Sequence, residues 1–113
     1  MAGTLVSRGN IIYEQILQVT ITPTSVGTLA SSTQTFTVPG LATNMYVQTG
    51  GPQGAQTAGI LIVNSWVSAA NTLSIQFYNP TAGSLTPVAG TYILDAAQAE
   101  SPTVNNTPFP TAF

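Results

Sequence analysis

Residues 60–78 read ILIVNSWVSAANTLSIQFY, and they contain the two clearest strands of the chain. Ile60 to Val67 is apolar on both faces, which predicts a central strand covered on both sides. Trp66 within it is expected to be a core anchor, since a large aromatic side chain buries much area. The next run alternates, and its apolar side chains share one face: Leu73, Ile75 and Phe77. Because the link Ser68 to Asn71 is short, the two runs predict an antiparallel hairpin.

Further strands are predicted on both sides of this hairpin. Gln15 to Thr22 and Thr33 to Val38 alternate apolar with polar residues, and each run ends at a proline. Asn44 to Gln48 is a shorter strand, and Thr91 to Leu94 is the last. The segment Thr49 to Gly59 has no periodicity and many glycines, so we expect a long surface loop.

Two connecting segments resemble each other. Pro23 to Leu29 leads to Thr35-Phe36, and Pro80 to Leu85 leads to Thr91-Tyr92. Two similar loops that precede two similar strands are typical of related corners in a β-sandwich. We therefore predict an all-β fold, a single antiparallel β-sandwich or jelly-roll-like domain over residues 11–98. An N-terminal arm, residues 1–10, and a Pro-rich C-terminal arm, residues 99–113, flank it.

The composition excludes several classes of protein. Only 4% of the 113 residues are charged and 43% are hydrophobic. Disordered chains have low hydrophobicity and high net charge, so this composition predicts a folded chain. The longest apolar run is far shorter than the roughly 20 residues of a membrane-spanning helix. With a net charge of −2 there is no basic patch for nucleic acid. The first residues lack a secretory signal pattern, so we expect synthesis in a cytoplasm.

The side chains for catalysis are also scarce. There is no His and no Cys, and the acidic residues are Glu14, Asp95 and Glu100. Asp95 and Glu100 are conceivable as a glycosidase-type pair, but solvated charges are the better interpretation. Gly50 to Gly59 lacks the Gly-Lys-Ser/Thr ending of a phosphate-binding loop. We expect no enzymatic activity, metal, cofactor or small-molecule substrate.

A chain of this kind is expected to act by binding other proteins. The residues least easily placed in the sandwich lie in or next to the arms. An arginine is enriched at interfaces, and apolar anchors gain free energy when a partner covers them. The predicted partner-binding residues are Arg8, Ile11, Ile12, Tyr13, Phe109 and Phe113.

The stretch Val67 to Tyr92 resembles small structural proteins of tailed bacteriophages. The resemblance is carried by Asn79-Pro80-Thr81-Ala82-Gly83, which follows an aromatic-ended strand, and by Thr86-Pro87-Val88-Ala89-Gly90-Thr91-Tyr92. Gly27 to Gly40 is similar as well. The resemblance implies a β-sandwich that decorates or cements a capsid, bound to the major capsid protein on the outer surface of the virion. It also implies a homotrimer, commonly at threefold positions, which the low charge favours too.

Two alternatives stay open. One is a tail, fibre or head-spike component that contacts the host surface. The other is a carbohydrate-binding β-sandwich module, which requires exposed aromatic side chains; the candidates are Tyr46, Tyr78 and Tyr92.

Overall fold

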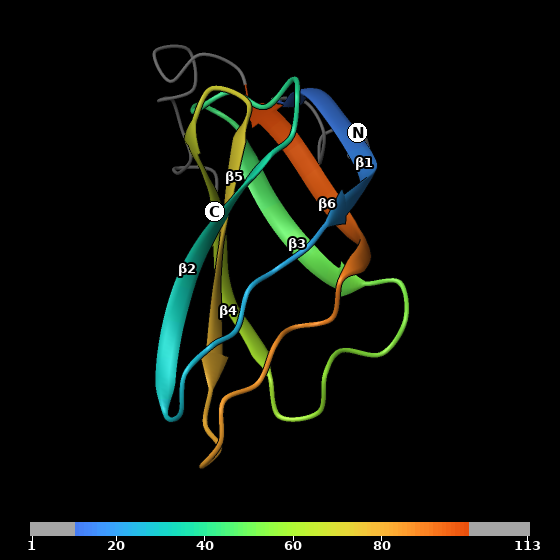
Figure 1. Cartoon of the computed structure of the whole chain (residues 1–113). Helices are drawn as coiled ribbons and strands as arrows, with labels where there is room; N and C mark the ends of the chain where they lie inside the picture. Colours follow the sequence, from blue (N-terminus) through green and yellow to red (C-terminus); the bar gives the residue numbers. More distant parts are fainter. Residues whose placement is uncertain (1–10, 100–113) are drawn as a thin grey trace, which may run out of the picture.

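The computed structural model of this protein describes residues 11–99, which form two packed antiparallel sheets of three strands each (Figure 1). The strand order is β1–β6–β3 in one sheet and β2–β5–β4 in the other. The six strands are β1 (Ile11–Ile21), β2 (Ala30–Thr37), β3 (Tyr46–Pro52), β4 (Leu61–Ala69), β5 (Thr72–Asn79) and β6 (Gly90–Ala99). The predicted all-β sandwich is confirmed.

The connections divide between the two ends of the sandwich. Among the six strands of residues 11–99, only β4 and β5 form a hairpin, as predicted, and each of the other connections passes from one sheet to the other. The loops 22–29, 53–60 and 80–89 lie at one end, which we call the loop end (Figure 1). At the opposite end, Ile11 of β1 pairs with Ala99 of β6. Both ends of the described chain therefore lie together, away from the loop end.

The core lies between the sheets and comes mainly from the two central strands. On β5 the side chains of Leu73, Ile75 and Phe77 are fully buried, and on β6 Tyr92 and Leu94 are fully buried. Alternation places each of these residues on the inner face of its strand. The core is completed by Ala96 of β6 and, from the other strands and loops, by Ile21, Val26, Val38, Leu41, Val47, Ile60 and Val67.

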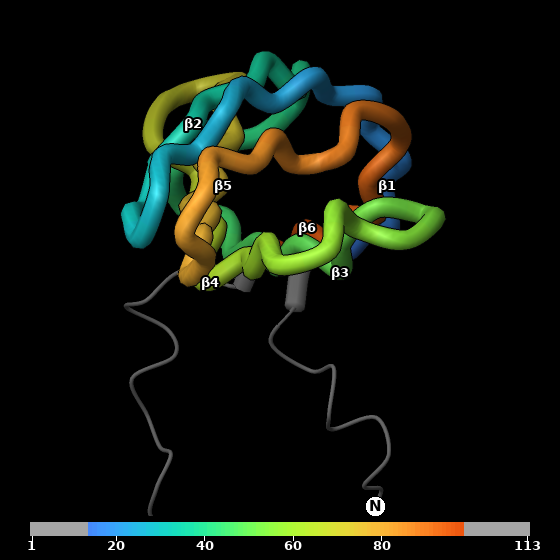
Figure 2. Tube along the Cα trace, turned by 60° about the horizontal axis from the view of Figure 1, so that its bottom comes forward, coloured from blue at the N-terminus to red at the C-terminus, as the bar shows by residue number. Residues whose placement is uncertain are grey.

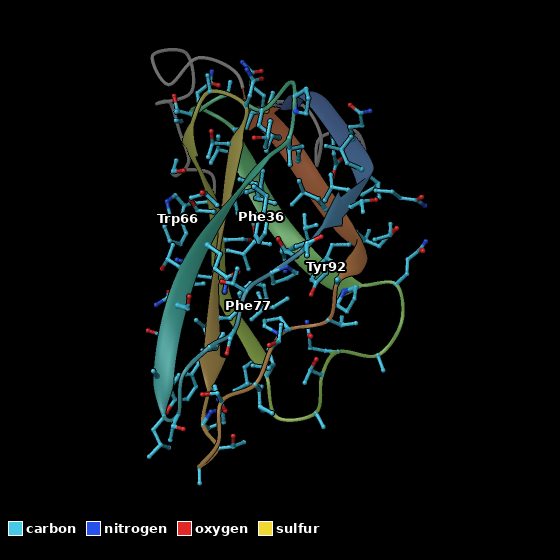
Figure 3. All side chains as sticks on the ribbon, viewed as in Figure 1. Phe36, Trp66, Phe77 and Tyr92 are labelled. Atoms are coloured by element: carbon cyan, nitrogen blue, oxygen red, sulfur yellow. The ribbon has the colours of Figure 1, made fainter. Side chains whose placement is uncertain are left out.

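The prediction that residues 60–67 form a central strand is wrong. β4 is an edge strand, and the central strand of its sheet is β5. In a regular strand, residues on the same face are an even number of positions apart. The register of β4 shifts between Ile62 and Asn64, and so Ile62 and Val67, five positions apart, both turn inward. The outer side chains Leu61 and Val63 are each 52% exposed, and Trp66 is 37% exposed. Trp66 is thus a surface residue, well away from the buried Tyr92 (Figure 3).

The predicted loop over residues 49–59 begins later than expected. β3 continues through Gly50 and Gly51 to Pro52, still paired with β6. The register shifts between Thr49 and Gly51, and Gly51 has a φ of +100°, a conformation that glycine adopts without strain. The glycines are therefore part of a bulged edge strand.

The two similar loops contact each other. Val26 donates its N–H to the Leu85 carbonyl at 2.7 Å, and Leu85 donates to the Val26 carbonyl at 3.1 Å. Figure 2 shows the two loops side by side across the loop end. Each joins a strand of one sheet to a strand of the other, in opposite directions. The likeness in sequence thus corresponds to two connections that run antiparallel and pair at Val26 and Leu85.

Candidate functional site

The predicted partner-binding residues divide into two groups. Arg8, Phe109 and Phe113 lie outside the described residues. Ile11, Ile12 and Tyr13 belong to the first part of β1, where the backbone pairs with residues 98 and 99 of β6. Because β1 and β6 are neighbours, the N-terminal and C-terminal arms join the sandwich at adjacent strands of one sheet.

A groove lies where the free edge of β3 approaches the free edge of β4. It has a volume of about 290 Å³ and is lined by residues of the two edges: Tyr46, Val47, Gln48, Thr49, Ile62, Val63, Asn64 and Ser65. The two strands belong to different sheets. One hydrogen bond joins them here, from the Thr49 N–H to Ser65 Oγ at 3.2 Å.

The groove combines an aromatic ring with polar groups. Tyr46 is 63% exposed and donates its hydroxyl to Gln48 Oε1 at 3.2 Å. Thr49 Oγ1 is buried and has no hydrogen-bond partner. Asn64 Oδ1 accepts only the N–H of the next residue, Ser65. The site therefore offers hydroxyl and amide groups beside a ring face, which is a chemistry suited to neutral polyhydroxylated ligands.

Sequence reasoning singles out only Tyr46 among the groove residues. The other two aromatic candidates differ from it: Tyr78 is half-buried and Tyr92 is fully buried. Tyr92 donates its hydroxyl to the Val88 carbonyl at 2.8 Å and accepts a hydrogen bond from Gln56 Nε2 at 3.0 Å. Burial raises the pKa of the Tyr92 hydroxyl, and the Gln56 hydrogen bond opposes this shift. Tyr92 is a core residue that holds two loops together.

The outer face of the β2–β5–β4 sheet carries no charged residue, since none occurs in these three strands. Along β2 its exposed residues are Ser31, Thr33, Thr35 and Thr37. Along β4 it presents Leu61 and Trp66. Between them Ser74 is buried and its hydroxyl donates to Ser68 Oγ at 2.8 Å. An uncharged face with exposed apolar side chains is cheap to desolvate when another protein covers it.

The acidic residues do not gather. Within residues 11–99 no group of three or more His, Cys, Asp or Glu side chains lies close enough to hold a metal ion. Asp95 lies in register between Ile16 and Gln48, and its Oδ1 is buried without a hydrogen-bond partner. Glu100, the other member of the conceivable carboxylate pair, lies outside the part of the chain that the structure describes.

In comparisons with known proteins, no protein-family model, no curated protein and no solved structure matches the chain. The described residues also contain no helix that could cross a membrane.

Proposed function

We propose that this chain is a structural protein of a tailed-bacteriophage virion that decorates the outer capsid surface and cements it by bridging major capsid protein subunits. The phage assignment rests on the sequence pattern around residues 79–92. The structural observation that supports it is the pairing of Ile11 with Ala99. Both arms start from this one end of the sandwich, so both can reach the same underlying surface.

The chemistry of the surface supports the same proposal. With one cationic and three anionic side chains in the whole sequence, strong ion pairs cannot supply the affinity. Apolar side chains and backbone hydrogen bonds must supply it. Each large side chain that a partner buries contributes about 1.5–3 kcal/mol, and a symmetric shell repeats the contact at every copy. Association of copies with one another, as a trimer in the family it resembles, belongs to the same proposal.

Truncation of each arm tests the proposal. Deletion of residues 1–10, or separately of 101–113, leaves all six strands intact. Circular dichroism is expected to give the spectrum of the intact protein. Binding to undecorated phage particles, measured by co-sedimentation and by the temperature at which the particles release DNA, is expected to weaken.

The outcomes separate the arms from the rest of the molecule. If both truncated proteins and a chain that lacks both arms decorate particles as fully as the intact chain, the attachment lies on the sandwich itself. If the intact chain binds no tailed-phage capsid, the proposed function is wrong. A chain that lacks both arms shows how the arms share the attachment. If the arms act together, each single deletion already weakens binding. If one arm can substitute for the other, binding is lost only in the double deletion.

The β3–β4 groove favours a second candidate function, the binding of a carbohydrate. Tyr46 can stack its exposed ring on a sugar face, and Gln48, Thr49 and Asn64 can bond to hydroxyls. Such binding fits a carbohydrate-binding module, or a tail, fibre or head-spike component that contacts the host surface.

A glycan array with the intact protein tests the second candidate. Specific binding that Tyr46→Ala abolishes supports it. Thr20→Ala is the control, since Thr20 is exposed on β1, which lies at the opposite edge of its sheet from β3 and away from the groove. No binding to any glycan, together with attachment to capsids, leaves decoration as the function.

A further inference from the structure

The four edge strands differ in how well they resist pairing with another chain. Edges of soluble proteins are usually protected by charged residues, prolines or bulges. β1 has a register shift after Ile11 and carries Glu14. β3 has a bulge at Thr49–Gly51 and ends at Pro52, and β4 has two register shifts.

β2 has none of these protections. Its eight residues, ASSTQTFT, include no charge, no proline and no glycine. It pairs with β5 without any register shift from Ala30 to Thr37. Figure 1 shows it at the outer side of its sheet. The preceding segment contacts it through the side chain of Gln34, which bonds to the N–H and the C=O of Thr24 at 2.8 and 2.9 Å, and not through the backbone of β2.

The unpaired backbone groups of β2 can be assigned from its register. The Val38 N–H donates to the Asn71 carbonyl at 2.9 Å, and this pair continues the β2–β5 register by one residue. In an antiparallel ladder, hydrogen-bonded and non-hydrogen-bonded pairs alternate. The N–H and C=O groups of the odd-numbered residues, Ser31, Thr33, Thr35 and Thr37, therefore point away from β5. Within residues 11–99 no backbone hydrogen bond satisfies them.

We propose that β2 pairs with β2 of a second copy of this chain, antiparallel, to make one continuous six-stranded sheet across a twofold axis. A second copy is the fitting occupant because the edge complements itself. An antiparallel strand offers the same alternation of donors and acceptors. Neither copy brings a charge to the contact, and opposed threonines are a favourable cross-strand pair.

One register uses all four outward residues. With Thr33 of one copy opposite Thr35 of the other, Ser31 lies opposite Thr37, and up to about eight hydrogen bonds form. The same register brings Leu29, next to the start of β2, near Pro39 of the second copy. Leu29 is 66% exposed and has a φ of +50°, which is unusual for a leucine. The second copy would cover this exposed side chain.

The twofold contact is independent of the proposed capsid attachment and compatible with a trimer formed through another surface. It requires an even number of chains in solution: a dimer, or a hexamer if a trimer contact is also made. Light scattering on the full chain measures this number. The double substitution Thr33→Lys/Thr35→Lys places like charges directly opposite each other and is expected to halve the mass. Gln18→Lys/Thr20→Lys adds the same charge to exposed positions of β1 and is expected to leave it unchanged.

Hydrogen exchange on the unaltered protein gives a second measurement that does not depend on a variant folding. The amides of residues 31, 33, 35 and 37 are expected to be protected at high concentration and to lose protection on dilution. A monomer or a lone trimer at all concentrations overturns the proposal, as does a mass unchanged in the folded lysine variant. Protection of these amides that appears only on capsids also overturns it, in favour of a strand from the capsid protein.

Discussion

Val26 and Leu85 exchange backbone hydrogen bonds in both directions, at 2.7 and 3.1 Å, and so tie together the two loops that cross between the sheets. The buried side chain of Asn79 reinforces this contact. Its Nδ2 donates to the carbonyls of Val26 at 3.1 Å and Gly83 at 2.8 Å. Its Oδ1 accepts from the N–H and the hydroxyl of Thr81. All the hydrogen-bonding capacity of this amide is used.

Replacement of Asn79 by alanine is expected to destabilise the protein by about 1–3 kcal/mol, since it removes a buried amide that makes four hydrogen bonds, to the carbonyls of Val26 and Gly83 and to the N–H and hydroxyl of Thr81. Urea unfolding followed by circular dichroism measures the change. Asn64→Ala is the control, because Asn64 is exposed and its side chain bonds only to the N–H of its neighbour Ser65. Equal midpoints for the two variants would contradict this role of Asn79.

Gly59→Ala is expected to destabilise the loop end by about 1–3 kcal/mol, through backbone strain together with overpacking. Gly59 has a φ of +95°, and an added Cβ would lie 3.0 Å from both Leu85 Cδ1 and Thr81 Cγ2. Gly54→Ala, in the same loop, meets nothing within 4 Å and serves as the control. Thermal unfolding of the two variants checks the difference, and a similar loss in both would refute it.

Trp66→Ala is expected to cost much less stability than Phe77→Ala. Phe77 is fully buried, and truncation of a core phenylalanine costs about 3–5 kcal/mol. Trp66 is 37% exposed on an edge strand. Because it is the one tryptophan, its fluorescence in the folded protein should be quenched readily by acrylamide. Resistance to quenching in the protein held as a monomer would show that Trp66 is buried within the fold.

Stability is expected to fall as the pH rises above about 10, the ordinary pKa of tyrosine. Burial raises the pKa of Tyr92 in the folded protein. Above the unfolded pKa the unfolded chain therefore binds fewer protons than the folded one, and the free energy of unfolding decreases. Below that pH the contribution of Tyr92 is constant.

Substitution of Tyr92 tests this pH dependence. Tyr92→Phe should flatten the decline in the free energy of unfolding above pH 10, at a cost of about 1 kcal/mol at neutral pH from the lost hydrogen bonds. Tyr46→Phe, which removes an exposed tyrosine hydroxyl, is the matched control. An unaltered decline in Tyr92→Phe would mean that another group causes it.

The alternating runs were sufficient to predict most strands. Side chains on a strand point alternately to opposite faces, so a segment such as residues 33–38 reveals its inner face locally. The short link before Leu73 likewise predicted the β4–β5 hairpin. The likeness of residues 23–29 to 80–85 indicated related connections, although not that Val26 and Leu85 pair.

The tertiary structure alone decided which strands are central and which are edges. Residues 60–67 are more apolar than residues 72–79, yet β4 lies at the edge and β5 in the middle. The order of strands depends on pairings between distant segments, and a bulge shifts the side chains beyond it to other faces. The β3–β4 groove exists because two strands from different sheets lie next to one another. The open edge of β2 exists because no further strand pairs with it. Both features therefore depend on how distant parts of the chain are arranged in space, which the local sequence does not encode.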